Sequence, residues 1–108
     1  MPPVEISYRG LTPSPAIETA IHAWVERLAH VHDRIQHCHV WLTLPHGHHR
    51  HGPRFQVRLT VAIPGRDIAI THDAGHEDAY LALADAFVAA RRQLVDRARI
   101  RRGDRRAA

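Results

Sequence analysis

The sequence predicts an α+β fold with the element order β-α-β-β-β-α, in which two helices pack on one face of a four-stranded mixed sheet. Two observations carry this prediction. Four segments alternate apolar and polar residues, which is typical of half-buried strands. Two longer segments repeat apolar residues at steps of three and four, which is typical of amphipathic helices. With 108 residues, the chain is long enough for one core but not for two.

The first strand and the first helix are indicated by local patterns. Val4–Tyr8 alternates apolar and polar side chains, and a turn over residues 10–15 follows it. Ser14 and Pro15 then form a helix-start signal, because the hydroxyl can cap exposed N–H groups and proline suits the first helical position. We expect this helix to end near His32. Its apolar stripe is Ile17, Ile21, Trp24, Val25, Leu28 and Val31.

The second and third strands are predicted over residues 37–44 and 54–63, which alternate in the same way. Cys38 lies on the apolar face of the second strand, so we expect it in the core. Trp41 lies on the other face, where we also expect Arg54 and Arg58. An aromatic ring beside arginines can stack on bases, but packing against a dimer partner or a loop is equally consistent with the sequence.

The fourth strand and the last helix complete the fold. Pro64-Gly65 is a turn signal, and Ile68–His72 is the strand on its far side. Residues 73–77 connect to the last helix, which Asp78 is expected to cap. The expected buried stripe of this helix is Tyr80, Leu83, Phe87, Ala90 and Leu94. Short links predict antiparallel pairing of the last three strands, whereas the helical crossover predicts a parallel neighbour for the first strand.

The C-terminal end carries a concentrated positive charge. Residues 89–106 contain eight arginines and two aspartates, although the net charge of the whole chain is only +4. Such a surface usually faces a polyanion, because guanidinium groups bind phosphate through two hydrogen bonds. A solvated helix end, with arginines favoured by the helix dipole, is the alternative. The expected RNA-binding residues are Arg91, Arg92, Arg97, Arg99, Arg101 and Arg102, followed by Arg34 and Arg58. Residues 1–102 are expected to form the single domain, and residues 103–108 a basic, flexible tail.

A histidine-rich loop separates the second and third strands. His46, His48, His49 and His51 place four imidazoles within six residues, and imidazole is a good ligand for Zn, Ni and Cu. A structural zinc site, however, normally has four ligands at fixed spacing. The alternative is a polar loop that gains charge below about pH 6.5. Apart from a metal at this loop, we expect no cofactor.

Other function classes are disfavoured by what the sequence lacks. There is no Gly-rich phosphate loop, no Gly-x-Ser-x-Gly and no His-Glu-x-x-His, so we predict neither an enzyme nor a small-molecule substrate. The single cysteine excludes an intramolecular disulfide. No apolar stretch approaches the roughly 20 residues that span a bilayer. We therefore expect a cytoplasmic protein that does not bind a membrane.

Short motifs spread over nearly the whole chain resemble one protein family. The first helix runs into His32-Asp33-Arg34-Ile35 before a strand, as in the family pattern of helix, Asp-Arg-Ile and strand. Asp78-Ala79-Tyr80-Leu81-Ala82-Leu83 resembles the family's Asp-x-Tyr-x-Ala-Ile, and Arg92-Gln93-Leu94 matches its Arg-Gln-Leu. In order and spacing these motifs resemble the ribosome hibernation promoting factor family, which includes the ribosome-associated translation inhibitors. The histidine loop is similar to that of a shorter, ribosome-associated subgroup.

The resemblance implies a protein that binds the rRNA of the small ribosomal subunit through its basic helix. It would occupy the channel where mRNA and tRNA meet, and repress translation under stress or in stationary phase. The better-known members carry an acid at the position of Ala84 and lysines near Ala89, Asp96 and Ala98, so the placement of charge differs here.

Two other hypotheses stay open at this point. One is a general structured-RNA-binding domain that resembles the double-stranded RNA-binding fold. The other is a metal-responsive interaction module centred on His46–His51. The sequence does not fix the oligomeric state, and it is compatible with a homodimer.

Overall fold

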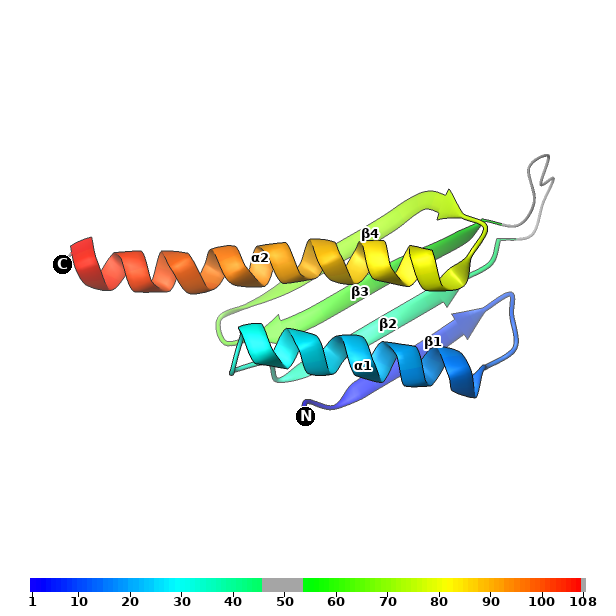
Figure 1. The fold of residues 1–108 in the computed structure, drawn as a ribbon, viewed down its shortest axis with the longest axis horizontal. Helices are drawn as coiled ribbons and strands as arrows, with labels where there is room; N and C mark the ends of the chain where they lie inside the picture. Colours follow the sequence, from blue (N-terminus) through cyan, green and yellow to red (C-terminus); the bar gives the residue numbers. More distant parts are fainter. Residues whose placement is uncertain (46–53, 108) are drawn as a thin grey trace.

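The predicted element order is confirmed in the computed structural model, which describes residues 1–45 and 54–107, except for the side chains of 72–76 and 101–107. Figure 1 shows the elements in chain order, coloured from blue to red. They are β1 (Val4–Arg9), α1 (Pro15–Val31), β2 (His37–Thr43), β3 (Phe55–Ile63), β4 (Arg66–His76) and α2 (Ala79–Ala107).

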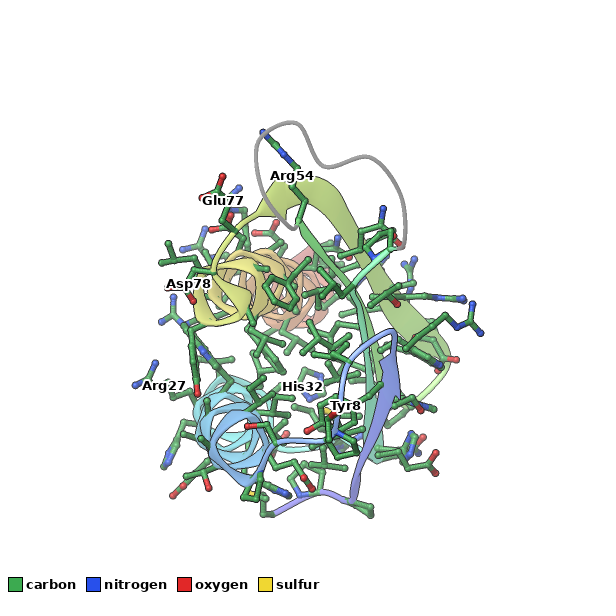
Figure 2. The ribbon with its side chains drawn as sticks, turned by 90° about the vertical axis from the view of Figure 1, so that its right-hand side faces the viewer. Tyr8, Arg27, His32, Arg54, Glu77 and Asp78 are labelled. Atoms are coloured by element: carbon green, nitrogen blue, oxygen red, sulfur yellow. The ribbon has the colours of Figure 1, made fainter. Side chains whose placement is uncertain are left out.

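The strands form one mixed sheet in the order β1-β2-β3-β4. β1 is parallel to β2, and the other two pairs are antiparallel, as the connection lengths predict. Both helices lie on the same face of this sheet (Figures 1 and 2). The register aligns Ile6, Val40, Leu59 and Ile70 across the four strands, which gives the sheet an apolar face against the helices. Within the residues that the structure describes, the other face of the sheet carries no helix.

The limits of α1 are those that the sequence predicts. The Oγ of Ser14 accepts a hydrogen bond from the N–H of Ile17 at 3.3 Å, and Pro15 is the first helical residue. At the other end His32 has an extended backbone, and its N–H still donates to the carbonyl of Leu28 at 3.1 Å. The buried face consists of Ile17, Ile21, Val25 and Leu28. Two further members of the predicted stripe, Trp24 and Val31, are only partly buried at the edge of the core.

The buried stripe of α2 differs from the prediction at one residue. Leu83, Phe87, Ala90 and Leu94 are fully buried as expected, but Tyr80 is 47% exposed. The remaining buried positions are the alanines Ala79, Ala82 and Ala86. Small side chains allow a helix to approach the sheet closely. The prediction assigned the larger Tyr80 to the buried stripe and left these alanines out. Full burial of a side chain the size of Phe87 stabilises the fold by about 1.5–3 kcal/mol.

β4 is longer than predicted. It spans Arg66–His76, where the sequence indicated only Ile68–His72. At its beginning, Arg66 and Asp67 pair with the end of β3, at Ile63 and Ala62. At its end, His76 is aligned with Phe55 at the start of β3, and the register shifts between Phe55 and Val57. Such a bulge accommodates extra residues on one strand. The position of a bulge depends on the partner strand, so the local sequence does not predict it. The prediction that residues 73–77 form a connection was therefore wrong for 73–76.

Gly10 fixes the turn between β1 and α1. Its φ of +81° lies in the left-handed region, and a Cβ built there would collide with the carbonyl oxygen of Leu44. On the same stretch, the N–H of Leu44 donates to the carbonyl of Arg9 at 2.8 Å. This close approach ties the end of β2 to the end of β1 and requires glycine.

Candidate nucleic-acid interface

α2 extends well past the core that it covers. With 29 residues it is about 43 Å long, and Leu94 is the last buried residue among its described side chains, which end at Ile100. In Figure 1 its C-terminal part projects beyond the turn that joins β3 to β4. The backbone is helical through Ala107, and the mobility predicted for residues 103–108 stays a prediction. In the described part of the chain, no helix has the length and apolar character needed to cross a membrane.

Three of the predicted arginines gather on the solvent side of α2. Arg91, Arg92 and Arg99 are exposed and line one shallow groove, of about 240 Å³, along the helix surface. Arg92 and Arg99 are seven residues apart and therefore share a helix face. The other residues that line this groove are Val88, Val95 and Asp96. We call this surface the α2 arginine face.

The charges of the α2 arginine face are not neutralised within the described part of the molecule. The ion pairs found there join Glu5 on β1 to His37 and His39 on β2, far along the chain from α2. Asp96 lies in the groove, yet among the described residues none of the three arginines pairs with a carboxylate. The guanidinium groups are therefore available to an external anion.

Arg97 points to a different part of the surface from the other α2 arginines. It lines a hollow with His32 and with Ile63, next to the turn between β3 and β4. Arg34 lies two residues after His32 and is exposed, and its backbone N–H donates to Nδ1 of His32 at 3.1 Å. Arg97 and Arg34 are thus both adjacent to His32, at the end of the molecule where α1 stops.

Among the other predicted RNA-binding residues that the structure describes, Arg58 does not join this cluster. Arg58 is exposed on β3 and projects from the sheet face that carries no helix. Arg101 and Arg102 belong to α2, but their side chains lie outside the described part of the structure. The predicted set is therefore divided between two opposite faces of the domain.

Sequence reasoning missed Arg27 on α1. Its guanidinium carbon lies 4.6 Å from the ring centre of Trp24, which in turn stacks on Phe87 of α2 at 5.8 Å. Figure 2 shows Arg27 pointing away from the core on the helical side. The three-residue spacing between Trp24 and Arg27 could have indicated this contact, because residues so spaced are neighbours on a helix.

Cys38 is a core residue, as predicted. It is fully buried, and desolvation raises the pKa of its thiol to about 11. Such a thiol is protonated and shielded from solvent at neutral pH, which is the opposite of what a nucleophile requires.

The metal prediction is not addressed by the described residues. His46, His48, His49 and His51 lie outside them. Among the described side chains, no three histidines, cysteines or carboxylates gather into a group that could hold a metal ion. Metal binding by the histidine loop stays a prediction.

A four-stranded mixed sheet, with two helices on one face and exposed arginines along the second, defines a class of small α+β domains with a cationic helix. The chain belongs to the family described as sigma 54 modulation protein / S30EA ribosomal protein, whose model matches residues 4–102. The resemblance to the ribosome hibernation promoting factor family is thereby confirmed.

Solved structures support the same fold. The N-terminal domain of Protein Y from Thermus thermophilus is similar with a TM-score of 0.74 and 20% identity, over 89% of this chain and 98% of that one. A ribosomal subunit interface protein from Coxiella burnetii is similar with a TM-score of 0.73 and 18% identity, over 87% of this chain and 94% of that one. A comparison with curated proteins found no match.

Proposed function

We propose that the chain binds the small ribosomal subunit through the α2 arginine face and represses translation during stress or stationary phase. One observation carries the proposal. Arg91, Arg92 and Arg99 are exposed side by side, without carboxylate partners among the described residues, in a member of a ribosomal protein family. The double-stranded RNA-binding alternative is disfavoured, because the parallel strand β1 and the family match both point elsewhere.

The chemistry of the α2 arginine face suits folded RNA. Guanidinium groups bind phosphate oxygens through charge-assisted pairs of hydrogen bonds. Contacts of this kind give affinity without selecting a base sequence, so recognition depends on the shape of the rRNA backbone. On this helix Arg92 and Arg99 share a face and lie about 10 Å apart along the axis, a separation that suits two phosphates of one backbone better than a single anion.

Repression in this proposal is steric. A domain held in the decoding region occupies the channel that mRNA and tRNA use, so initiation is blocked for as long as the domain stays bound. Binding makes and breaks no covalent bond, and repression ends when the domain dissociates from the subunit. The proposed partner is therefore rRNA in the cytoplasm, and neither a small-molecule substrate nor catalysis is proposed.

The proposal is tested by competition on isolated small subunits. The chain is bound first, and an mRNA with its initiator tRNA is added at increasing concentration. We expect the chain to be displaced, and translation in a cell-free system to fall as the chain is added. Stable simultaneous binding of chain, mRNA and tRNA, with translation unaffected, would overturn the proposal.

Sedimentation equilibrium of the free chain tests the homodimer that the sequence leaves open.

A further inference from the structure

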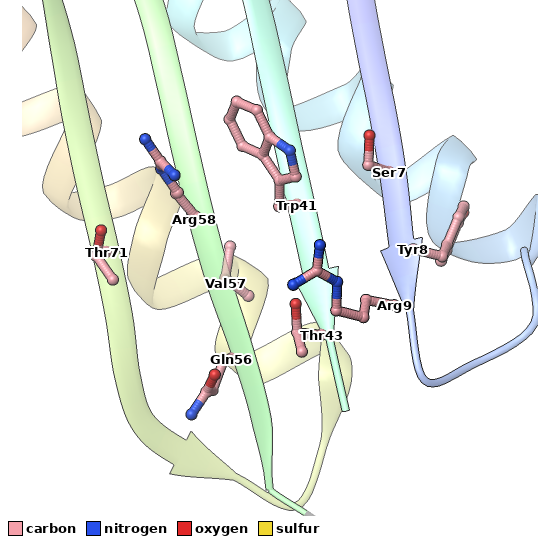
Figure 3. A pocket seen from close by; sticks show the side chains of 9 residues that line it. All are labelled: Ser7, Tyr8, Arg9, Trp41, Thr43, Gln56, Val57, Arg58 and Thr71. Carbon is pink, nitrogen blue, oxygen red and sulfur yellow. The ribbon is translucent and has the colours of Figure 1, made fainter. Parts of the chain in front are cut away.

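The sheet face that carries no helix has a second positively charged surface. Ser7, Trp41, Arg58 and Thr71 are aligned neighbours on the four strands and form one row across this face. Arg9 belongs to the next row, with Thr43 and Gln56. Together these residues line a hollow of about 460 Å³. Figure 3 shows the indole of Trp41 between the guanidinium groups of Arg9 and Arg58.

The indole of Trp41 is held in place by its neighbours. The ring of His39 stacks on it, with the ring centres 3.5 Å apart and the planes 14° from parallel. His39 is in turn fixed to β1, because its Nε2 lies 2.9 Å from the hydroxyl of Ser7 and its Nδ1 lies 3.4 Å from a carboxylate oxygen of Glu5. The guanidinium carbon of Arg58 lies 5.0 Å from the indole centre. The indole of Trp41 is therefore preorganised between its contacts with His39 and with Arg58.

The charge of the hollow favours an anionic ligand. Arg9 and Arg58 line it, and none of its lining residues is acidic. Within the described residues neither arginine pairs with a carboxylate, since Glu5 on the same face is engaged with histidines. Hydroxyl and amide groups of Thr43, Gln56 and Thr71 complete the lining. An apolar protein partner would leave these polar groups without hydrogen bonds.

We propose that this sheet face binds single-stranded RNA, with an unpaired base stacked on Trp41 and Arg58 and backbone phosphates bound by Arg9 and Arg58. Bases splayed out of a single strand stack on aromatic rings and on guanidinium planes, and each stacked base adds substantially to affinity. Arg9 and Arg58 come from β1 and β3, two strands apart or roughly 10 Å, a spacing that suits successive phosphates of a strand that crosses the sheet.

The inference goes beyond the proposed function, because it assigns RNA binding to the face opposite the helices. It is tested with a labelled eight-nucleotide oligoadenylate and no ribosomes, so its failure leaves the ribosomal proposal untouched. Fluorescence anisotropy measures binding to the full chain and to R9Q/R58Q. The matched control is R27Q/R66Q, which removes the same charge from exposed positions on the helical side, outside this hollow and outside the α2 arginine face. We expect R9Q/R58Q to weaken binding at least tenfold, and the control to change it less than threefold.

A second readout reports stacking directly. Trp24 and Trp41 are the two tryptophans, so the W24F variant leaves Trp41 as the single indole. We expect the oligonucleotide to quench its fluorescence, while adenosine monophosphate at the same nucleotide concentration does not compete. Circular dichroism of each variant confirms that the fold is retained. The inference is overturned by equal losses in the two charge variants, by an unquenched Trp41, by equal competition from the mononucleotide, or by loss of binding in R92Q/R99Q alone.

Discussion

Removing two arginines from the α2 arginine face should reduce the salt dependence of small-subunit binding by a calculable amount. Each phosphate that an arginine neutralises contributes about 0.7–0.9 to the slope of log affinity against log salt. α2 contains the six predicted contacts Arg91, Arg92, Arg97, Arg99, Arg101 and Arg102. Six such contacts give a slope of about −4 to −5, so that affinity falls roughly 300- to 2,000-fold between 50 and 200 mM salt.

The variant R92Q/R99Q retains four of these contacts. Its slope should be smaller in magnitude by about 1.4–1.8, and the same rise in salt should weaken its binding only roughly 50- to 150-fold. Anisotropy of the chain, labelled at its N-terminus and titrated with small subunits at four salt concentrations, measures both slopes. The control R27Q/R54Q, at exposed positions outside the α2 arginine face and outside the hollow that contains Arg97, should keep the wild-type slope. An unchanged slope in R92Q/R99Q, or an equal change in the control, would refute the assignment of phosphate contacts to the α2 arginine face.

Three further predictions concern the fold. Gly10→Ala should lower the free energy of unfolding by about 2–4 kcal/mol, because the new Cβ meets the carbonyl of Leu44 and φ is positive; chemical denaturation measures the loss, and a change below 1 kcal/mol contradicts it. Phe87→Ala should cost about 3–5 kcal/mol, whereas the exposed Val88→Ala should stay within about 0.5; equal effects would contradict the buried stripe. Cys38 should resist thiol reagents at pH 8 until the protein unfolds. Because its pKa rises from 9.0 unfolded to about 11 folded, its contribution to stability should be complete below pH 9 and lost towards pH 11; rapid labelling of the folded chain contradicts this.

Local signals in the sequence were sufficient to predict most of the fold. Ser14 and Pro15 begin α1, and the pattern stops at His32, because capping and proline chemistry act within a single turn of helix. The element order and the placement of both helices on one face follow from the apolar stripes. Features that depend on a partner elsewhere in the chain were not predictable. The extension of β4 involves pairing with Phe55, and the exposure of Tyr80 accompanies the burial of Ala79, Ala82 and Ala86 against the rest of the core.

The candidate sites were also predictable only where local sequence signals determine them. The number of arginines on α2 was evident from the sequence. That Arg97 lies apart from the other described arginines of this helix was not, because it depends on how the helix sits against the turn between β3 and β4. The row that joins Trp41 to Arg58 needs the β2–β3 register, although alternation did place both residues on the outer face. The position of Arg9 beside Thr43 likewise needs the register of the parallel β1–β2 pairing.

The most direct test of the central claim is sedimentation of the chain with purified ribosomal subunits at low salt. The full chain should travel with the small subunit and be released as salt is raised. R92Q/R99Q should be recovered with the small subunit in a smaller amount at the same salt, whereas R27Q/R54Q should behave as the unmodified chain. Absence of the full chain from the small-subunit peak, or equal recovery of R92Q/R99Q in that peak, would contradict the account.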